Sequence, residues 1–71
     1  MNEQRELRLT AVVTPDEDWY MARCLEVPVT SQGPTPEAAV ANLREALELY
    51  LEDEPVPAPA HIEHVGVRLP A

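Results

Sequence analysis

The sequence predicts a small α+β domain, in which one helix packs on one face of a small, largely antiparallel sheet in the order β-β-β-α-β. Apolar residues alternate with other residues near the N-terminus, and a strong helix start follows Gly33-Pro34. A second alternating stretch follows a proline-rich segment near the C-terminus. A chain of 71 residues is one domain at most, so residues 1–71 are interpreted as a single unit.

The first two strands are predicted from period-two patterning. Apolar residues at odd-numbered positions predict a strand with one apolar face, formed by Leu7, Leu9, Ala11 and Val13. The segment from Pro15 to Asp18 predicts a hairpin turn, because proline presets turn geometry and acidic residues stay solvated. Residues 19–25 predict the second strand. Its two faces are Tyr20, Ala22 and Cys24 on one side and Trp19, Met21 and Arg23 on the other.

A short third strand and the helix follow. Residues 29–32 predict the strand, which ends at Gly33. Thr35 is expected to cap the first free amide groups of the helix, and Pro36 suits its first position. The helix should run from residue 36 to about residue 52.

The helix should turn one apolar stripe toward the sheet. Its members are Ala39, Val40, Leu43, Ala46, Leu47, Tyr50 and Leu51. Residues 53–60 predict a linker, because alternating prolines favour an extended polyproline conformation that can lead the chain back along the helix. Residues 62–69 then predict a fourth strand, with Val65, Val67 and Leu69 on one face.

The charge is strongly acidic, with 13 Asp and Glu residues against five arginines and a formal net charge of −8. This argues against direct nucleic-acid binding, which needs a basic stripe. It fits a protein that covers a basic partner, and equally one whose charge only keeps it soluble. Because no apolar run approaches the ~20 residues of a membrane span and no signal-peptide core begins the chain, a cytoplasmic protein without membrane contact is expected.

The small size predicts self-association. A domain of this length buries only about 60% of its unfolded surface, and such domains usually gain stability from disulfides, a metal or a partner subunit. The single cysteine, Cys24, excludes an intramolecular disulfide. A homo-oligomer, either a dimer or a tetramer, is therefore expected.

Residues that could carry chemistry are few, so no catalytic residue, metal ligand or cofactor is predicted. His61 and His64 lie three positions apart, which places them on opposite faces of a strand. Cys24 is expected to be a small buried hydrophobe, because no activating base lies nearby in the sequence. The carboxylates of residues 16–18 point in different directions from one turn, which favours a solvated turn or a partner contact over a shared Mg²⁺.

The face of the sheet away from the helix is the predicted interaction surface. Val12, Trp19 and Met21 would form an apolar patch there, rimmed by Arg8, Thr10 and Arg23. Such patches often mark interfaces and tryptophan is a common anchor; the alternative is that Trp19 only covers the end of the hairpin. The residues predicted to contact a partner or a second copy are Asp16, Glu17, Asp18, Trp19 and Met21.

Most of the chain resembles the HicB family of antitoxins. Residues 18–28 contain an acidic residue, an aromatic strand and a proline; residues 31–39 contain a Gln-Gly-x-Thr helix start; residues 42–52 form a helix rich in Glu, Leu and Ala. The resemblance implies a β-β-β-α-β domain similar to part of the RNase H fold. It also implies that Gly33, Thr35 and Pro36 determine how the helix begins.

HicB antitoxins are not enzymes; they neutralise HicA, a small basic ribonuclease toxin, by covering its catalytic histidine. The resemblance therefore implies that this chain binds and occludes a HicA-like toxin. The chain departs from many members at Val29, where they have glycine, and the C-terminal DNA-binding domain of longer members is not expected. Two alternatives stay open: an orphan self-associating protein-binding domain without a toxin, and a vestigial RNase H-like hydrolase that uses Asp16 or Asp18 with Mg²⁺.

Overall fold

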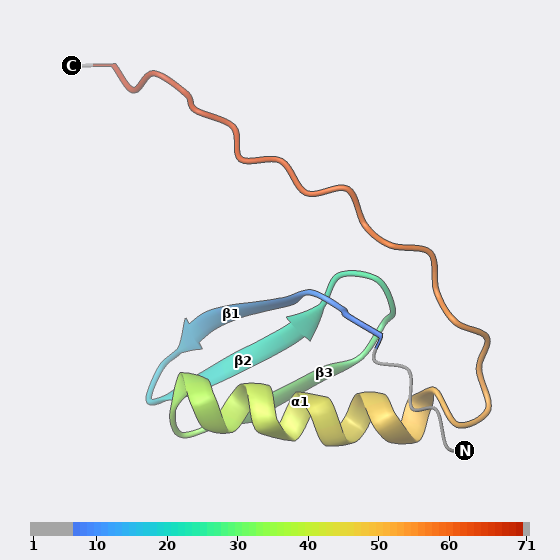
Figure 1. The fold of residues 1–71 in the computed structure, drawn as a ribbon. Coiled ribbons are helices and arrows are strands. Elements are labelled where there is room, and N and C mark those ends of the chain that lie inside the picture. Colours follow the sequence, from blue (N-terminus) through green and yellow to red (C-terminus); the bar gives the residue numbers. More distant parts are fainter. Residues whose placement is uncertain (1–6, 71) are drawn as a thin grey trace.

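The computed structural model describes residues 7–70, which form three strands and one helix (Figure 1). In chain order these are β1 (Ala11–Asp16), β2 (Trp19–Cys24), β3 (Thr30–Gly33) and α1 (Pro36–Tyr50). The strands form one antiparallel sheet in the order β1-β2-β3, and α1 packs on one face of it. The predicted α+β class, with one helix on a small antiparallel sheet, is confirmed. Within the described residues, the helix is too short and too polar to cross a bilayer.

β1 and β2 form a hairpin with a two-residue turn. Their pairing ends with Asp16 opposite Trp19, which leaves Glu17 and Asp18 as the turn. The prediction that the turn begins at Pro15 is wrong, because Pro15 still pairs within β1, an edge strand where a proline is tolerated. Glu17 has a φ of 57°, the left-handed conformation that tight two-residue hairpin turns need.

The core lies between the sheet and α1. Its buried residues are Ala22 and Cys24 from β2 and Ala39 and Leu43 from α1. Six partly buried apolar residues surround them: Leu9, Val13, Tyr20, Val27, Val29 and Leu47. The expected burial of Cys24 is confirmed. Since Leu43 is the only large side chain in this core, the described part of the chain buries little apolar volume for its length.

The predicted start of α1 is confirmed. The Thr35 hydroxyl accepts a hydrogen bond of 3.0 Å from the Ala38 N–H, and Pro36 occupies the first helical position. Together they satisfy one free amide and preset the first helical torsion. The helix ends at Tyr50, slightly before the expected end at Glu52.

Gly33, at the end of β3, lies directly against the first turns of α1. A Cβ atom at this position would be 2.6 Å from the Ala39 nitrogen and 2.8 Å from the Ala38 carbonyl carbon. The Asn42 amide also donates a 2.9 Å hydrogen bond to the Gln32 carbonyl oxygen. Glycine is therefore required at residue 33 by the close approach of helix and strand.

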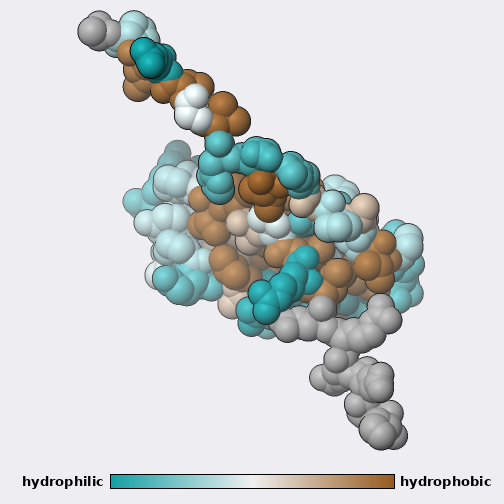
Figure 2. All heavy atoms as spheres, turned by 45° about the horizontal axis from the view of Figure 1, so that its top comes forward, coloured by the Kyte–Doolittle hydropathy of each residue, from teal (hydrophilic) through white to brown (hydrophobic). Residues whose placement is uncertain are grey.

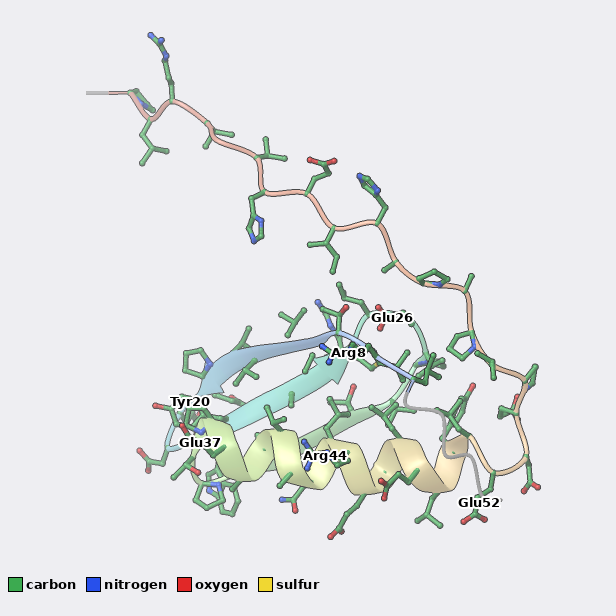
Figure 3. The ribbon with its side chains drawn as sticks, viewed as in Figure 1. Arg8, Tyr20, Glu26, Glu37, Arg44 and Glu52 are labelled. Carbon is green, nitrogen blue, oxygen red and sulfur yellow. The ribbon has the colours of Figure 1, made fainter. Side chains whose placement is uncertain are left out.

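Glu26 ties the loop after β2 to the chain before β1 (Figure 3). One carboxylate oxygen accepts a 2.8 Å hydrogen bond from the Thr10 backbone N–H, and the other accepts a 2.8 Å bond from the Thr10 hydroxyl. The Cys24 thiol donates to the same carboxylate at 3.3 Å. These hydrogen bonds, first that of the Thr10 amide, lower the pKa of Glu26. The alternating pattern did not predict this contact, because it joins residues 16 positions apart.

Replacing Glu26 by glutamine should lower the free energy of unfolding at pH 7 by about 1 kcal/mol, because a neutral amide with one acceptor oxygen replaces a partly exposed carboxylate. The pKa of Glu26 is lower in the folded chain than in the unfolded chain, so the ionised carboxylate stabilises the fold above the unfolded pKa of about 4.3. This stabilisation is lost as the pH falls through the folded pKa. Urea unfolding at pH 7 and at about pH 2.5 measures the effect. The difference between the proteins should shrink in acid, whereas Glu45→Gln on the exposed side of α1 should have little effect at either pH. An equal loss at both pH values would contradict this role for Glu26.

The expected fourth strand over residues 62–69 is not formed. Residues 55–70 contain no helix or strand, and the chain runs away from the sheet instead of returning along α1 (Figure 1). The radius of gyration is consequently 15.0 Å, against about 11 Å for a compact chain of this length. Alternation predicts an extended backbone, but a strand also needs a partner, and no strand of the described chain pairs with this segment.

Candidate protein-binding surface

The face of the sheet opposite α1 carries the residues predicted to contact a partner. Ala22 of β2 is buried beneath the helix, so the side chains of Trp19 and Met21 point to the opposite face. On that face Met21 lies between Thr14 of β1 and Gln32 of β3. The predicted orientation of Trp19 and Met21 away from the helix is confirmed. Over residues 7–70 α1 is the only helix and it packs on the other face, so no second layer covers this patch.

The predicted rim of this patch is only partly correct. Arg23 pairs with Thr30 on the outer face and is exposed. Arg8 and Thr10 instead line a groove beside α1, and the Thr10 hydroxyl is bonded to Glu26. The Thr10 hydroxyl is therefore engaged by the loop after β2 and is not a free group at the rim.

The hairpin brings acidic and aromatic residues together at one end of the sheet. Asp16 pairs directly with Trp19, and Glu17 and Asp18 join them. All four residues are exposed, and Trp19 keeps 49% of its surface accessible. Cross-strand partners share a face, so Asp16, Trp19 and Met21 form one continuous surface with the acidic turn at its end.

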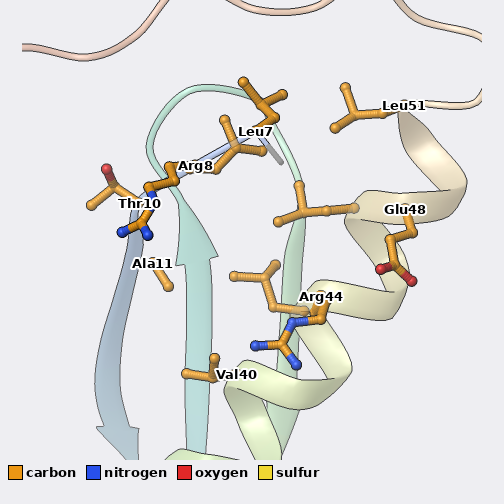
Figure 4. A pocket seen from close by; sticks show the side chains of 11 residues that line it. Leu7, Arg8, Thr10, Ala11, Val40, Arg44, Glu48 and Leu51 are labelled. Carbon is orange, nitrogen blue, oxygen red and sulfur yellow. The ribbon is translucent and has the colours of Figure 1, made fainter. Parts of the chain in front are cut away.

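A groove lies between α1 and the chain that leads into β1 (Figure 4). It has a volume of about 870 Å³, and sequence reasoning did not anticipate it. Its lining residues are Leu7, Arg8, Leu9, Thr10, Ala11, Val40, Leu43, Arg44, Leu47, Glu48 and Leu51. The groove exists because α1 lies mainly over β3 and β2, which leaves residues 7–11, where the chain enters β1, partly uncovered. In Figure 2, hydrophobic side chains gather across the middle of the domain and hydrophilic ones border them.

The described residues that could bind a metal or react lie in separate parts of the structure. No group of three or more His, Cys, Asp or Glu side chains within residues 7–70 is placed to hold a metal ion. The Cys24 thiol is buried and donates to Glu26. His61 contacts Glu63 at 2.5 Å on the exposed C-terminal segment. The surface at the hairpin and the groove beside α1 are therefore the two features suited to binding a protein.

Comparison of the chain with protein-family models, with curated proteins and with solved structures found no match.

Proposed function

We propose that this chain is a HicB-like antitoxin that binds and occludes a small, basic ribonuclease toxin of the HicA type. The proposal rests first on the resemblance of residues 18–28, 31–39 and 42–52 to that family. The β-β-β-α order of the described residues agrees with the first four elements of the β-β-β-α-β fold that the resemblance implies. Binding, not chemistry, is the proposed activity.

The observation that carries the proposal is the composition of the hairpin end. Three consecutive acidic residues, 16–18, adjoin the half-exposed Trp19 on a sheet face that no other helix or strand of residues 7–70 covers. Carboxylates attract and orient a basic partner, while an exposed tryptophan supplies apolar contact area. The net charge of −8 acts in the same direction over longer range. A surface of this kind can cover a site that a basic ribonuclease uses for RNA.

The runner-up is an orphan self-associating domain that has no toxin partner. Its support is the small core, in which Leu43 is the largest fully buried side chain of the described residues. The hydrolase alternative is disfavoured, because the carboxylates of residues 16–18 are consecutive and none from a second element joins them in the described structure.

The first test is co-expression with the protein encoded in the adjacent reading frame. The neighbour alone should arrest growth, and this chain should bind it in a pulldown and restore growth. A neighbour that is neither toxic nor bound would contradict the antitoxin role and favour the orphan domain.

Variants then test the surface itself. Trp19→Ala should weaken toxin binding by about 30-fold or more, as expected for an anchor worth about 2 kcal/mol. The double variant Asp16→Asn, Asp18→Asn should slow association most at low salt. Its matched control, Glu45→Gln with Glu52→Gln, removes the same charge from exposed positions on and just after α1. Equal weakening by the two double variants would show that net charge, and not the hairpin surface, determines binding.

A further inference from the structure

We infer that residues 62–69 of a second copy of this chain occupy the groove beside α1 as an added strand along residues 7–11, where the chain enters β1, in a symmetric dimer that exchanges its C-terminal segments. This inference does not depend on the toxin-binding proposal. It concerns the opposite layer of the domain from the hairpin surface.

The groove is a site that the described domain leaves incomplete. Its walls include the apolar residues Leu9, Leu43 and Leu47, and Leu51 closes the end near the helix C-terminus. The volume of about 870 Å³ is room for a chain segment and not for one side chain. An open apolar groove of this size beside a small core is a surface that gains stability when covered.

The edge of β1 supplies the backbone groups that an added strand needs. Because the sheet order is β1-β2-β3, β1 has a neighbour on one side only. The groove runs beside residues 7–11, where the chain enters β1, so a strand in the groove would lie along these residues and reach the free edge at the start of β1. Pro15, near the end of β1, lacks an N–H group, so an added strand cannot accept a backbone hydrogen bond from that residue. Strand addition to a free edge is a common mode of protein recognition.

The C-terminal segment has the length and pattern of the missing strand. Val65, Val67 and Leu69 recur at every second position and are 79%, 74% and 83% exposed. In extended backbone they share one side and span about 13 Å. The groove follows α1 from Val40 to Leu51, a distance of about 16 Å along a helix axis. Three apolar side chains on one strand therefore match the groove in length and chemistry.

Charge is complementary as well. Arg8 and Arg44 line the groove, and Glu63 lies on the same side of the extended segment as Val65. Glu48 also lines the groove, so the lining carries one arginine on each side and one carboxylate, and the segment brings a further carboxylate to these arginines. Pairing of Glu63 with either arginine favours this occupant over an uncharged apolar peptide.

The C-terminal segment projects away from its own domain. Pro55, Pro57 and Pro59 restrict the linker to extended conformations, and the molecule is 60 Å long and 29 Å by 20 Å across. In this arrangement the segment lies outside its own groove, where the groove of a second copy can receive it (Figure 1). Reciprocal exchange fills both grooves and creates a closed two-fold dimer.

The test compares matched variants of the full chain by sedimentation equilibrium over about 1–200 μM. The wild type should be a dimer. Val65→Asp with Val67→Asp places two charges on the groove-facing side and should weaken dimerisation by at least about 100-fold. His64→Asp with Gly66→Asp adds the same charge on the other side of the segment and should change the dimer constant by less than about threefold. Circular dichroism establishes that each variant keeps its secondary structure.

An isotope-filtered nuclear Overhauser experiment on a mixture of labelled and unlabelled wild-type chains distinguishes the two ways to fill the groove. Contacts between Val65, Val67 or Leu69 of one chain and Leu47 or Leu51 of the other are expected. A wild-type monomer, a dimer that tolerates both changes equally, or groove contacts found only within one chain would each overturn the inference.

Discussion

Replacing Leu43 by alanine should lower the free energy of unfolding by about 3 kcal/mol. Leu43 is 2% exposed and is the largest fully buried side chain of the described residues. Its core neighbours Ala22, Cys24 and Ala39 are small and two of them are alanines, so they cannot expand to fill the space that a shortened residue 43 leaves. A domain of this length has a total stability on the order of 4–10 kcal/mol, so this one change should remove a large part of it.

Leu49→Ala is the matched control, because it makes the same change on the same helix. Leu49 is 69% exposed, so its truncation should cost at most about 0.5 kcal/mol. Urea unfolding monitored by circular dichroism compares the two variants at one protein concentration. If both variants lose the same stability, the packing of α1 on the sheet through Leu43 is not the main source of stability.

Replacing Gly33 by alanine should destabilise the fold by about 2–3 kcal/mol. The added Cβ would meet the Ala39 nitrogen at 2.6 Å and the Ala38 carbonyl carbon at 2.8 Å, which are backbone atoms and cannot rotate away. The first turn of α1 must therefore move off β3. This movement would strain the hydrogen bond from Asn42 to the Gln32 carbonyl. The expected loss of stability already includes a small opposing gain, because alanine restricts the unfolded chain more than glycine does.

Gly66→Ala is the control for this prediction. A Cβ at residue 66 would meet no atom within 4 Å, so its stability should stay within about 0.5 kcal/mol of the wild type. Thermal unfolding at equal protein concentration compares the two alanine variants. A Gly33→Ala protein as stable as the Gly66→Ala protein would show that helix and strand do not approach as closely as 2.6 Å implies.

The candidate surface was predictable where it depends on local pattern. Alternation along β2 is enough to place Trp19 and Met21 on the face opposite Ala22, because successive side chains of a strand point to opposite sides. The hairpin turn brings the acidic residues to the same end, although it is shorter than the proline suggested. The alternating pattern could not predict the rim of this surface, because the Thr10 hydroxyl is bonded to Glu26, which lies 16 residues further along the chain.

The groove beside α1 could not be predicted for a related reason. The apolar stripe of α1 indicates that the helix packs on the sheet, but not over which strands its axis lies. That position depends on the contact between α1 and Gly33 and on the bond from Asn42 to Gln32, both of which draw the helix toward β3. The side of residues 7–11 that faces α1 is left open as a consequence.

The sequence by itself determined the class of the fold, the three strands, the capped start of α1 at Thr35 and the two faces of the sheet. These features depend on local torsional preferences and on the periods of strand and helix, which are properties of neighbouring residues. Only the tertiary structure decided the position of α1 over the sheet, the contact of Glu26 with Thr10 and the projection of residues 55–70. Each of these depends on whether a distant segment supplies a packing surface or a hydrogen-bond partner, and alternation along one segment carries no information about its partner.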